Sequence, residues 1–174
     1  MELTARLRRR IRVALGVFLV GLVVSGLSAF PLLTEVEWLG RVLGLPERSD
    51  VAGLSGLPAW IAMVRVGLRE MDAKYPFMAY GTDWLAFGHL AIAVFFLGPL
   101  LRPDTNRWVV VAGMIACVGV WLTALICGAI RGIPVWWRLI DCSFGILGLI
   151  PLWVAAQAQS DLVRITSRTN GGMR

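Results

Sequence analysis

Four long apolar runs dominate this chain and limit the folds that are open to it. They cover residues 11–33, 84–101, 108–130 and 135–157. About 20 apolar residues in helical form cross a bilayer core of about 30 Å, so each run is long enough to span a membrane. The chain is 57% hydrophobic and 16% charged, whereas soluble domains carry about 25% charged residues. We therefore predict an all-α, polytopic membrane protein with four transmembrane helices in a single membrane domain.

Short polar turns join the last three runs. RPDTNR (102–107) separates the second run from the third, and RGIPVWWR (131–138) joins the third run to the start of the fourth. Turns this short make neighbouring spans antiparallel, which predicts an up-down bundle. Small residues let membrane helices approach closely. We expect this role for five glycines of the first and fourth spans: Gly16, Gly21, Gly26, Gly145 and Gly148.

Residues 34–82 form the extended polar segment between the first two spans. Within it, apolar residues recur at helical spacing at Trp60, Ile61, Val64, Leu68 and Met71. Three polar residues, Arg65, Arg69 and Asp72, fall on another face, and Pro58 suits a first helical turn. We predict a short amphipathic helix over residues 57–72, which lies on the bilayer or caps the bundle. Docking of a partner protein on this helix is the alternative.

The positions of the basic residues predict the orientation of the chain. Most of the 17 basic residues border the first run, the 102–107 turn or the tail, and the net charge is +6. Basic flanks mark the cytoplasmic side of a span and hold anionic lipid headgroups, so this charge predicts no nucleic-acid partner. We predict that residues 1–10 and 158–174 are cytoplasmic, that segment 34–82 is extracytoplasmic, and that the protein resides in the bacterial inner membrane.

The first run resembles a signal peptide in its arginine-rich start, but it is longer. The uncharged stretch covers residues 13–33, whereas the apolar region of a signal peptide has about 7–15 residues. The best cleavage site, near Ala29, has Leu27 where a small residue is preferred. We therefore predict an uncleaved first span.

The cysteines and the histidine restrict the chemistry that this sequence predicts. Cys117, Cys127 and Cys142 all fall in apolar runs and form no CxxC pair, so we predict neither a disulfide framework nor a metal site. Haem held by two histidines needs a second His beside His89, which this chain lacks. We predict no resident cofactor. Haem or quinone is expected only under the alternative function given below.

Ionisable and aromatic residues gather at one predicted end of the bundle. His89 lies six residues after Asp83, so about 9 Å further along the helix and about 120° around it. Arg138 and Asp141 are three residues apart and can face each other. An ionisable group inside a span is expected to point inward and to find a partner. We predict a polar site at the outer face, formed by Asp83, Trp84, His89, Arg131, Trp137, Arg138 and Asp141.

Two functions follow from this site. The first is a non-enzymatic accessory or small-amphiphile-binding protein, whose polar residues either tie the spans together or hold the head of a ligand. The alternative is a membrane redox or lipid-modifying enzyme component that acts on a quinone or a lipid. His89 would then carry a proton and Arg138 would anchor an anionic group. We assign no catalytic residue, and the partners that we expect are the bilayer and either a larger membrane complex or further copies of the chain.

Three stretches carry a resemblance to known sequences. They are YGTDWLAFGH (80–89), RPDTNRW (102–108) and RGIPVWWRLIDCSFG (131–145). Through them the chain resembles a family of uncharacterised small bacterial four-helix integral membrane proteins, from the first span to the end of the fourth. The resemblance implies the four-helix fold, and it implies no activity because none is assigned to the family. Five residues of the predicted site lie inside these stretches: Asp83, His89, Arg131, Arg138 and Asp141.

Overall fold

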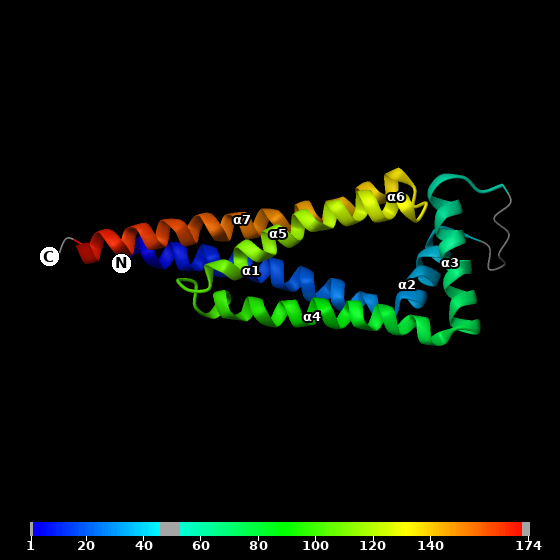
Figure 1. Cartoon of the computed structure of the whole chain (residues 1–174), viewed down its shortest axis with the longest axis horizontal. Helices are drawn as coiled ribbons and strands as arrows, with labels where there is room; N and C mark the ends of the chain where they lie inside the picture. Colours follow the sequence, from blue (N-terminus) through cyan, green and yellow to red (C-terminus); the bar gives the residue numbers. More distant parts are fainter. Residues whose placement is uncertain (1, 46–52, 172–174) are drawn as a thin grey trace. The chain divides into compact units, whose positions relative to one another are not determined.

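The protein is all-helical, as predicted. The computed structural model describes residues 2–45 and 53–171, and 89% of these described residues are in helices. The α-helices are α1 (Glu2–Ala29), α2 (Leu32–Val42), α3 (Gly56–Lys74), α4 (Tyr80–Leu101), α5 (Arg107–Leu122), α6 (Gly128–Ile130) and α7 (Val135–Gly171). A 3-10 helix, η1 (Pro76–Ala79), precedes α4, and a π-helix, η2 (Thr123–Cys127), joins α5 to α6 (Figure 1).

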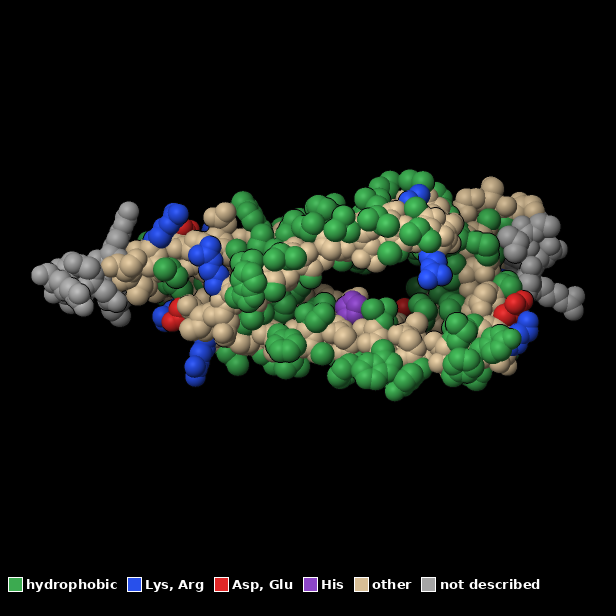
Figure 2. Space-filling view, in the orientation of Figure 1, with side chains coloured by type: hydrophobic (Ala, Val, Ile, Leu, Met, Phe, Trp, Pro, Cys, Tyr) green, Lys and Arg blue, Asp and Glu red, His purple; other side chains and the backbone are tan. Residues whose placement is uncertain are grey.

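Among the residues that the structure describes, four helical segments are long and apolar enough to cross a membrane, which confirms the predicted polytopic fold. They are Glu2–Ala29, Pro76–Leu101, Arg107–Ile130 and Val135–Ser167. Large apolar side chains cover much of the visible face of these helices (Figure 2). Val17, Phe95 and Leu147 are each more than half exposed. Lipid is the solvent that suits such a surface, since soluble monomers rarely expose large apolar patches.

The chain forms two compact units. Unit 1 comprises residues 1–22 and 92–174, and unit 2 comprises residues 23–91. Unit 1 therefore holds the larger part of α1, the end of α4, and all of α5, η2, α6 and α7. Unit 2 holds the end of α1, then α2, α3 and η1, and the start of α4.

All four long helices contribute to the core of unit 1. Its fully buried side chains include Ile11 of α1, Val110 of α5 and Leu152 of α7. Phe96 of α4 packs against Phe18 of α1, with ring centroids 4.7 Å apart and planes tilted by 52°. The helices α5 and α7 run along each other (Figure 1), because the turn that joins them is short. This arrangement is the predicted packing of antiparallel neighbours.

Glycines permit the close approach of α5 and α7. A Cβ atom at Gly145 would lie 2.6 Å from the carbonyl oxygen of Cys117, and one at Gly148 would lie 3.0 Å from its sulfur. The prediction is therefore confirmed for Gly145 and Gly148, and also for Gly26 in unit 2, where a Cβ atom would lie 2.9 Å from Cβ of His89. It is wrong for Gly16 and Gly21, where an added Cβ atom meets nothing within 4 Å. Spacing along a helix does not reveal which glycine faces a neighbour.

The ends of the first and last helices differ from the predicted spans. The helix α1 has 28 residues and ends at Ala29 instead of continuing to residue 33. Pro31, which follows it, lacks a backbone N–H and sits at the N-cap of α2. The helix α7 has 37 residues, so it is about 55 Å long at 1.5 Å per residue. The predicted polar tail from residue 158 is thus helical as far as Gly171.

Unit 2 contains the predicted amphipathic helix and a second helix that was not predicted. The expected helix over residues 57–72 is α3, and α2 packs against it. Arg65, predicted to lie on the polar face of this helix, is 2% exposed and lies against Gly40 of α2. Arg69 of α3 forms an ion pair with Glu37 of α2 at 2.8 Å. The polar face of α3 therefore packs against α2 at Arg65 and Arg69.

Candidate functional site

The α6–α7 end of unit 1 contains a π-helix followed by a tight turn. The π-helix η2 covers Thr123–Cys127, and the turn closes with the N–H of Ile133 donating to the carbonyl of Gly128 at 2.9 Å. Gly132 supports this turn in the left-handed region, with a φ of 70°. A π-helix shifts backbone carbonyls away from their α-helical partners and is frequent at functional sites.

Arg138 is anchored on this π-helix. Its Nη1 donates a hydrogen bond to the carbonyl oxygen of Leu125 at 3.2 Å. Gly128 makes room for the aliphatic part of the side chain, since a Cβ atom there would lie 2.6 Å from Cδ of Arg138. The Nε atom is buried and has no hydrogen-bond acceptor among the residues that the structure describes. The guanidinium is thus held in place while part of its donor capacity is unused.

The other predicted residues of unit 1 surround this position in sequence. Asp141 lies one turn after Arg138 and is half-buried, and Arg131 is exposed. Within residues 2–45 and 53–171, no ion pair joins Arg138 to Asp141. The side chain of Arg138 binds the preceding π-helix, η2, and not a neighbouring turn of α7. Trp137 contacts Trp136 edge to face, with ring centroids 5.8 Å apart.

Three residues near this site escaped sequence reasoning. Leu125 contributes only a backbone carbonyl, which leaves no signal in its side chain. Gly128 could have been identified from the sequence, because it is a small residue on the other side of a tight turn from Arg138, an arginine in a predicted span. Trp121 donates through Nε1 to the carbonyl of Cys142 at 3.0 Å, which joins α5 to α7 beside the site. An indole inside a predicted span is itself a hint, since a buried Trp N–H usually finds an acceptor.

His89 lies on α4 in unit 2. Its Nδ1 donates to the carbonyl oxygen of Leu85 at 2.8 Å, because a carbonyl can only accept. In the neutral ring, Nε2 is then the nitrogen that carries the lone pair. Gly26 of α1 approaches the same turn, since a Cβ atom there would lie 2.9 Å from Cβ of His89. The ring of His89 is half-buried.

Asp83 and Trp84 begin the same helix. Asp83 is half-buried and Trp84 is exposed. Trp84 contacts Tyr80 and Phe87 edge to face, with ring centroids 5.9 Å and 5.6 Å apart. Exposed aromatic side chains of this kind are typical of the boundary between lipid and water. The start of α4 therefore fits a position at a membrane surface.

The seven predicted site residues belong to two units. Arg131, Trp137, Arg138 and Asp141 are in unit 1, whereas Asp83, Trp84 and His89 are in unit 2. That the two groups together form one site stays a prediction.

The chemistry available at Arg138 is binding through N–H donors and positive charge. Such a group suits a phosphate, a carboxylate or a carbonyl oxygen. Among the described residues, no cluster of three or more His, Cys, Asp or Glu side chains is placed to hold a metal ion. The three cysteines are free thiols, of which Cys117 is buried and Cys127 is exposed.

No protein-family model matches the chain, and no match is found among curated proteins or solved structures. The resemblance carried by the three stretches of sequence gains no support from these comparisons. Function is therefore inferred from the residues themselves.

Proposed function

We propose that the protein is a non-enzymatic accessory protein of the bacterial inner membrane that binds the head of a small amphiphile at its outer face. Both termini are cytoplasmic in this proposal, so the α6–α7 turn is extracytoplasmic. The observation that carries it is the guanidinium of Arg138, which is anchored on Leu125 and has a buried Nε without an acceptor in the described part of the chain.

The energetics of a charge inside a membrane span support a bound ligand at Arg138. An arginine within a span is costly unless it is paired or hydrated. Its guanidinium has five N–H donors, and the carbonyl of Leu125 accepts from one nitrogen. An anionic or carbonyl-bearing head group supplies further acceptors. Asp141, one turn along α7, favours a head that also carries a donor, such as a hydroxyl or an ammonium group.

Retention of ligand through purification tests this proposal. The full chain is purified in mild detergent, and bound lipid and quinone are extracted and quantified by mass spectrometry. Arg138→Gln is expected to lower the bound ligand about tenfold or more, because a hydrogen bond to a charged group contributes about 1.5–3 kcal/mol. Arg107→Gln removes the same charge from an exposed position at the start of α5, outside the predicted site, and is the matched control, with ligand content unchanged.

Thermal stability, measured on the same samples, separates binding from a structural role. Loss of ligand with little loss of stability supports the binding function. Loss of stability in Arg138→Gln without any change in bound lipid would show that the arginine only ties α5 to α7. Co-purification of a stoichiometric partner protein would support the accessory function and identify the assembly.

The alternative function is a redox or lipid-modifying component in which His89 carries a proton. The hydrogen bond from Nδ1 to Leu85 favours it, since this bond leaves Nε2 as the proton-accepting nitrogen. The purification distinguishes the two functions. A Soret band, or one quinone per chain that His89→Ala removes, supports the alternative, whereas a colourless protein with bound lipid supports the preferred function.

The orientation is tested by reporters fused to the carboxyl end. The basic side chains that flank α1 and the α4–α5 turn support a cytoplasmic location for both termini. We expect a green fluorescent protein fusion at this end to fluoresce and an alkaline phosphatase fusion to be inactive. The reverse result would place the α6–α7 end in the cytoplasm and move the proposed ligand to the inner leaflet.

A further inference from the structure

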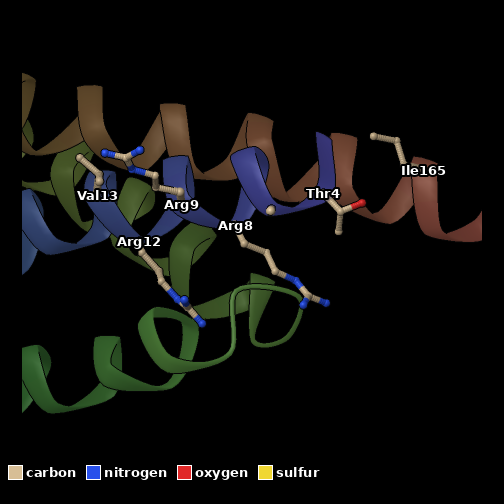
Figure 3. Close-up of a pocket in the computed structure, with 7 residues that line it drawn as sticks. Thr4, Arg8, Arg9, Arg12, Val13 and Ile165 are labelled. Carbon is tan, nitrogen blue, oxygen red and sulfur yellow. The ribbon is translucent and has the colours of Figure 1, made fainter. Parts of the chain in front are cut away.

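A basic groove lies at the opposite end of unit 1 from Arg138. It has a volume of about 790 Å³ and is lined by Thr4, Ala5, Arg8, Arg9, Arg12, Val13 and Ile165. The last of these belongs to α7 and the others to α1. Positions 8 and 12 are four residues apart, so Arg8 and Arg12 share one side of α1. Figure 3 shows Arg8 and Arg12 extending to the same side of the helix.

The groove rests on a packed pair of helices. Leu7 and Ile11 of α1 are buried in one core cluster with Ala158 and Leu162 of α7. Ile165, which lines the groove, packs against the same cluster. The backbone that carries the arginines is therefore supported along its length, and the groove is part of the fold of unit 1.

One carboxylate forms an ion pair with these arginines among the described residues. Arg8 pairs with Asp104 of the α4–α5 turn at 3.6 Å, with both side chains about half exposed. Gln159 of α7 holds this turn by donating to the carbonyl of Pro103 at 3.1 Å. Arg9 and Arg12 have no ion-pair partner in the part of the chain that the structure describes. The groove thus carries excess positive charge and keeps donor capacity for an anion.

The groove also lies at the boundary between charged and apolar sequence. Arg12 is the last charged residue before the uncharged stretch of residues 13–33, and Val13 lines the groove beside it. A phospholipid has the same order of groups, with a phosphate next to acyl chains. Guanidinium groups bind phosphate through paired N–H donors. We propose that this groove binds a phosphate ester through Arg8 and Arg12, and that an anionic phospholipid headgroup is its source.

Lipid binding by matched charge variants tests the proposal. Full-length protein in mild detergent is incubated with phosphatidylglycerol or phosphatidylethanolamine, and bound lipid is counted by native mass spectrometry. The double variant Arg8→Gln, Arg12→Gln is expected to bind phosphatidylglycerol at least tenfold more weakly, since each basic side chain contributes about a factor of five. The control, Arg6→Gln with Arg10→Gln, removes two charges from the same helix outside the groove and is expected to stay within about twofold of wild type.

The control variant distinguishes a specific binding site from a surface that binds lipid through its net positive charge alone. Equal loss in both double variants, or no loss in either, would overturn the groove as a site. Arg12→Gln alone leaves the Arg8–Asp104 ion pair intact, so it keeps the test valid if the double variant does not fold. A parallel titration with inorganic phosphate separates the two sources. Displacement of phosphatidylglycerol by an equal concentration of phosphate supports the anion chemistry and overturns the lipid as its source.

Discussion

Replacement of Gly145 by Ala is expected to lower the free energy of unfolding by about 1–3 kcal/mol, the usual cost of forcing extra atoms into a packed interface. A Cβ atom there would lie 2.6 Å from the carbonyl oxygen of Cys117 and 2.6 Å from Nε1 of Trp121. The oxygen belongs to the backbone of α5, so the strain is relieved only if α5 and α7 move apart. That movement would also strain the hydrogen bond from Trp121 to Cys142.

Gly119→Ala is the matched control for this prediction. Gly119 lies in α5, the helix against which Gly145 packs, but a Cβ atom at Gly119 meets nothing within 4 Å. The substitution is expected to leave stability unchanged or to raise it by up to about 1 kcal/mol, because Ala favours helix more than Gly does. Unfolding by SDS titration in mild detergent, followed by tryptophan fluorescence, measures both variants. Equal effects of the two substitutions would contradict the close contact of α5 with α7 at Gly145.

Leu152→Ala is expected to cost about 2–4 kcal/mol of unfolding free energy, the range for a large-to-small change that leaves a cavity. Leu152 is fully buried among the four helices of unit 1, in a cluster that includes Ile11, Phe96 and Val110. Lipid tails are as apolar as leucine, so the cost arises from lost contacts and the cavity and not from transfer out of water. The same SDS titration measures it.

Leu147→Ala makes the same chemical change on the same helix. Its side chain is 63% exposed, so in the membrane it faces lipid, which fills the space left by a smaller side chain. The expected change is within about 0.5 kcal/mol, as for surface substitutions in general. A large loss in this variant, with little change in Leu152→Ala, would mean that α7 presents the opposite face to the core.

These interfaces also position the proposed ligand site. Arg138 lies on α7, and its acceptor, the carbonyl of Leu125, lies on the π-helix that continues α5. Separation of α5 from α7 therefore stretches the bond that orients the guanidinium. The short connection through Gly132 maintains this register at the α6–α7 end, and Gly145 maintains it further along α7.

Sequence alone was enough to predict the helices that are long and apolar enough to cross a membrane. The third span, predicted over residues 108–130, is observed over Arg107–Ile130, and the fourth begins at the predicted Val135. The amphipathic helix predicted over 57–72 is observed as Gly56–Lys74. These predictions succeed because a bilayer requires a certain length of apolar helix, and because polar turns and prolines mark where each helix ends. The length of an apolar run and the residues that end a helix are both local properties, so they can be recognised in the sequence.

The partners of the polar side chains depend on how the helices are rotated about their axes. Arg138 binds a carbonyl of the preceding helix and forms no described ion pair with Asp141, although the two are three residues apart. Arg65 is buried because α2, a helix absent from the sequence prediction, covers it. Gly145 faces a neighbouring backbone and Gly16 faces none. Helix rotation follows from side-chain packing between segments that are distant in sequence. It therefore cannot be predicted from the hydropathy and residue spacing of one helix.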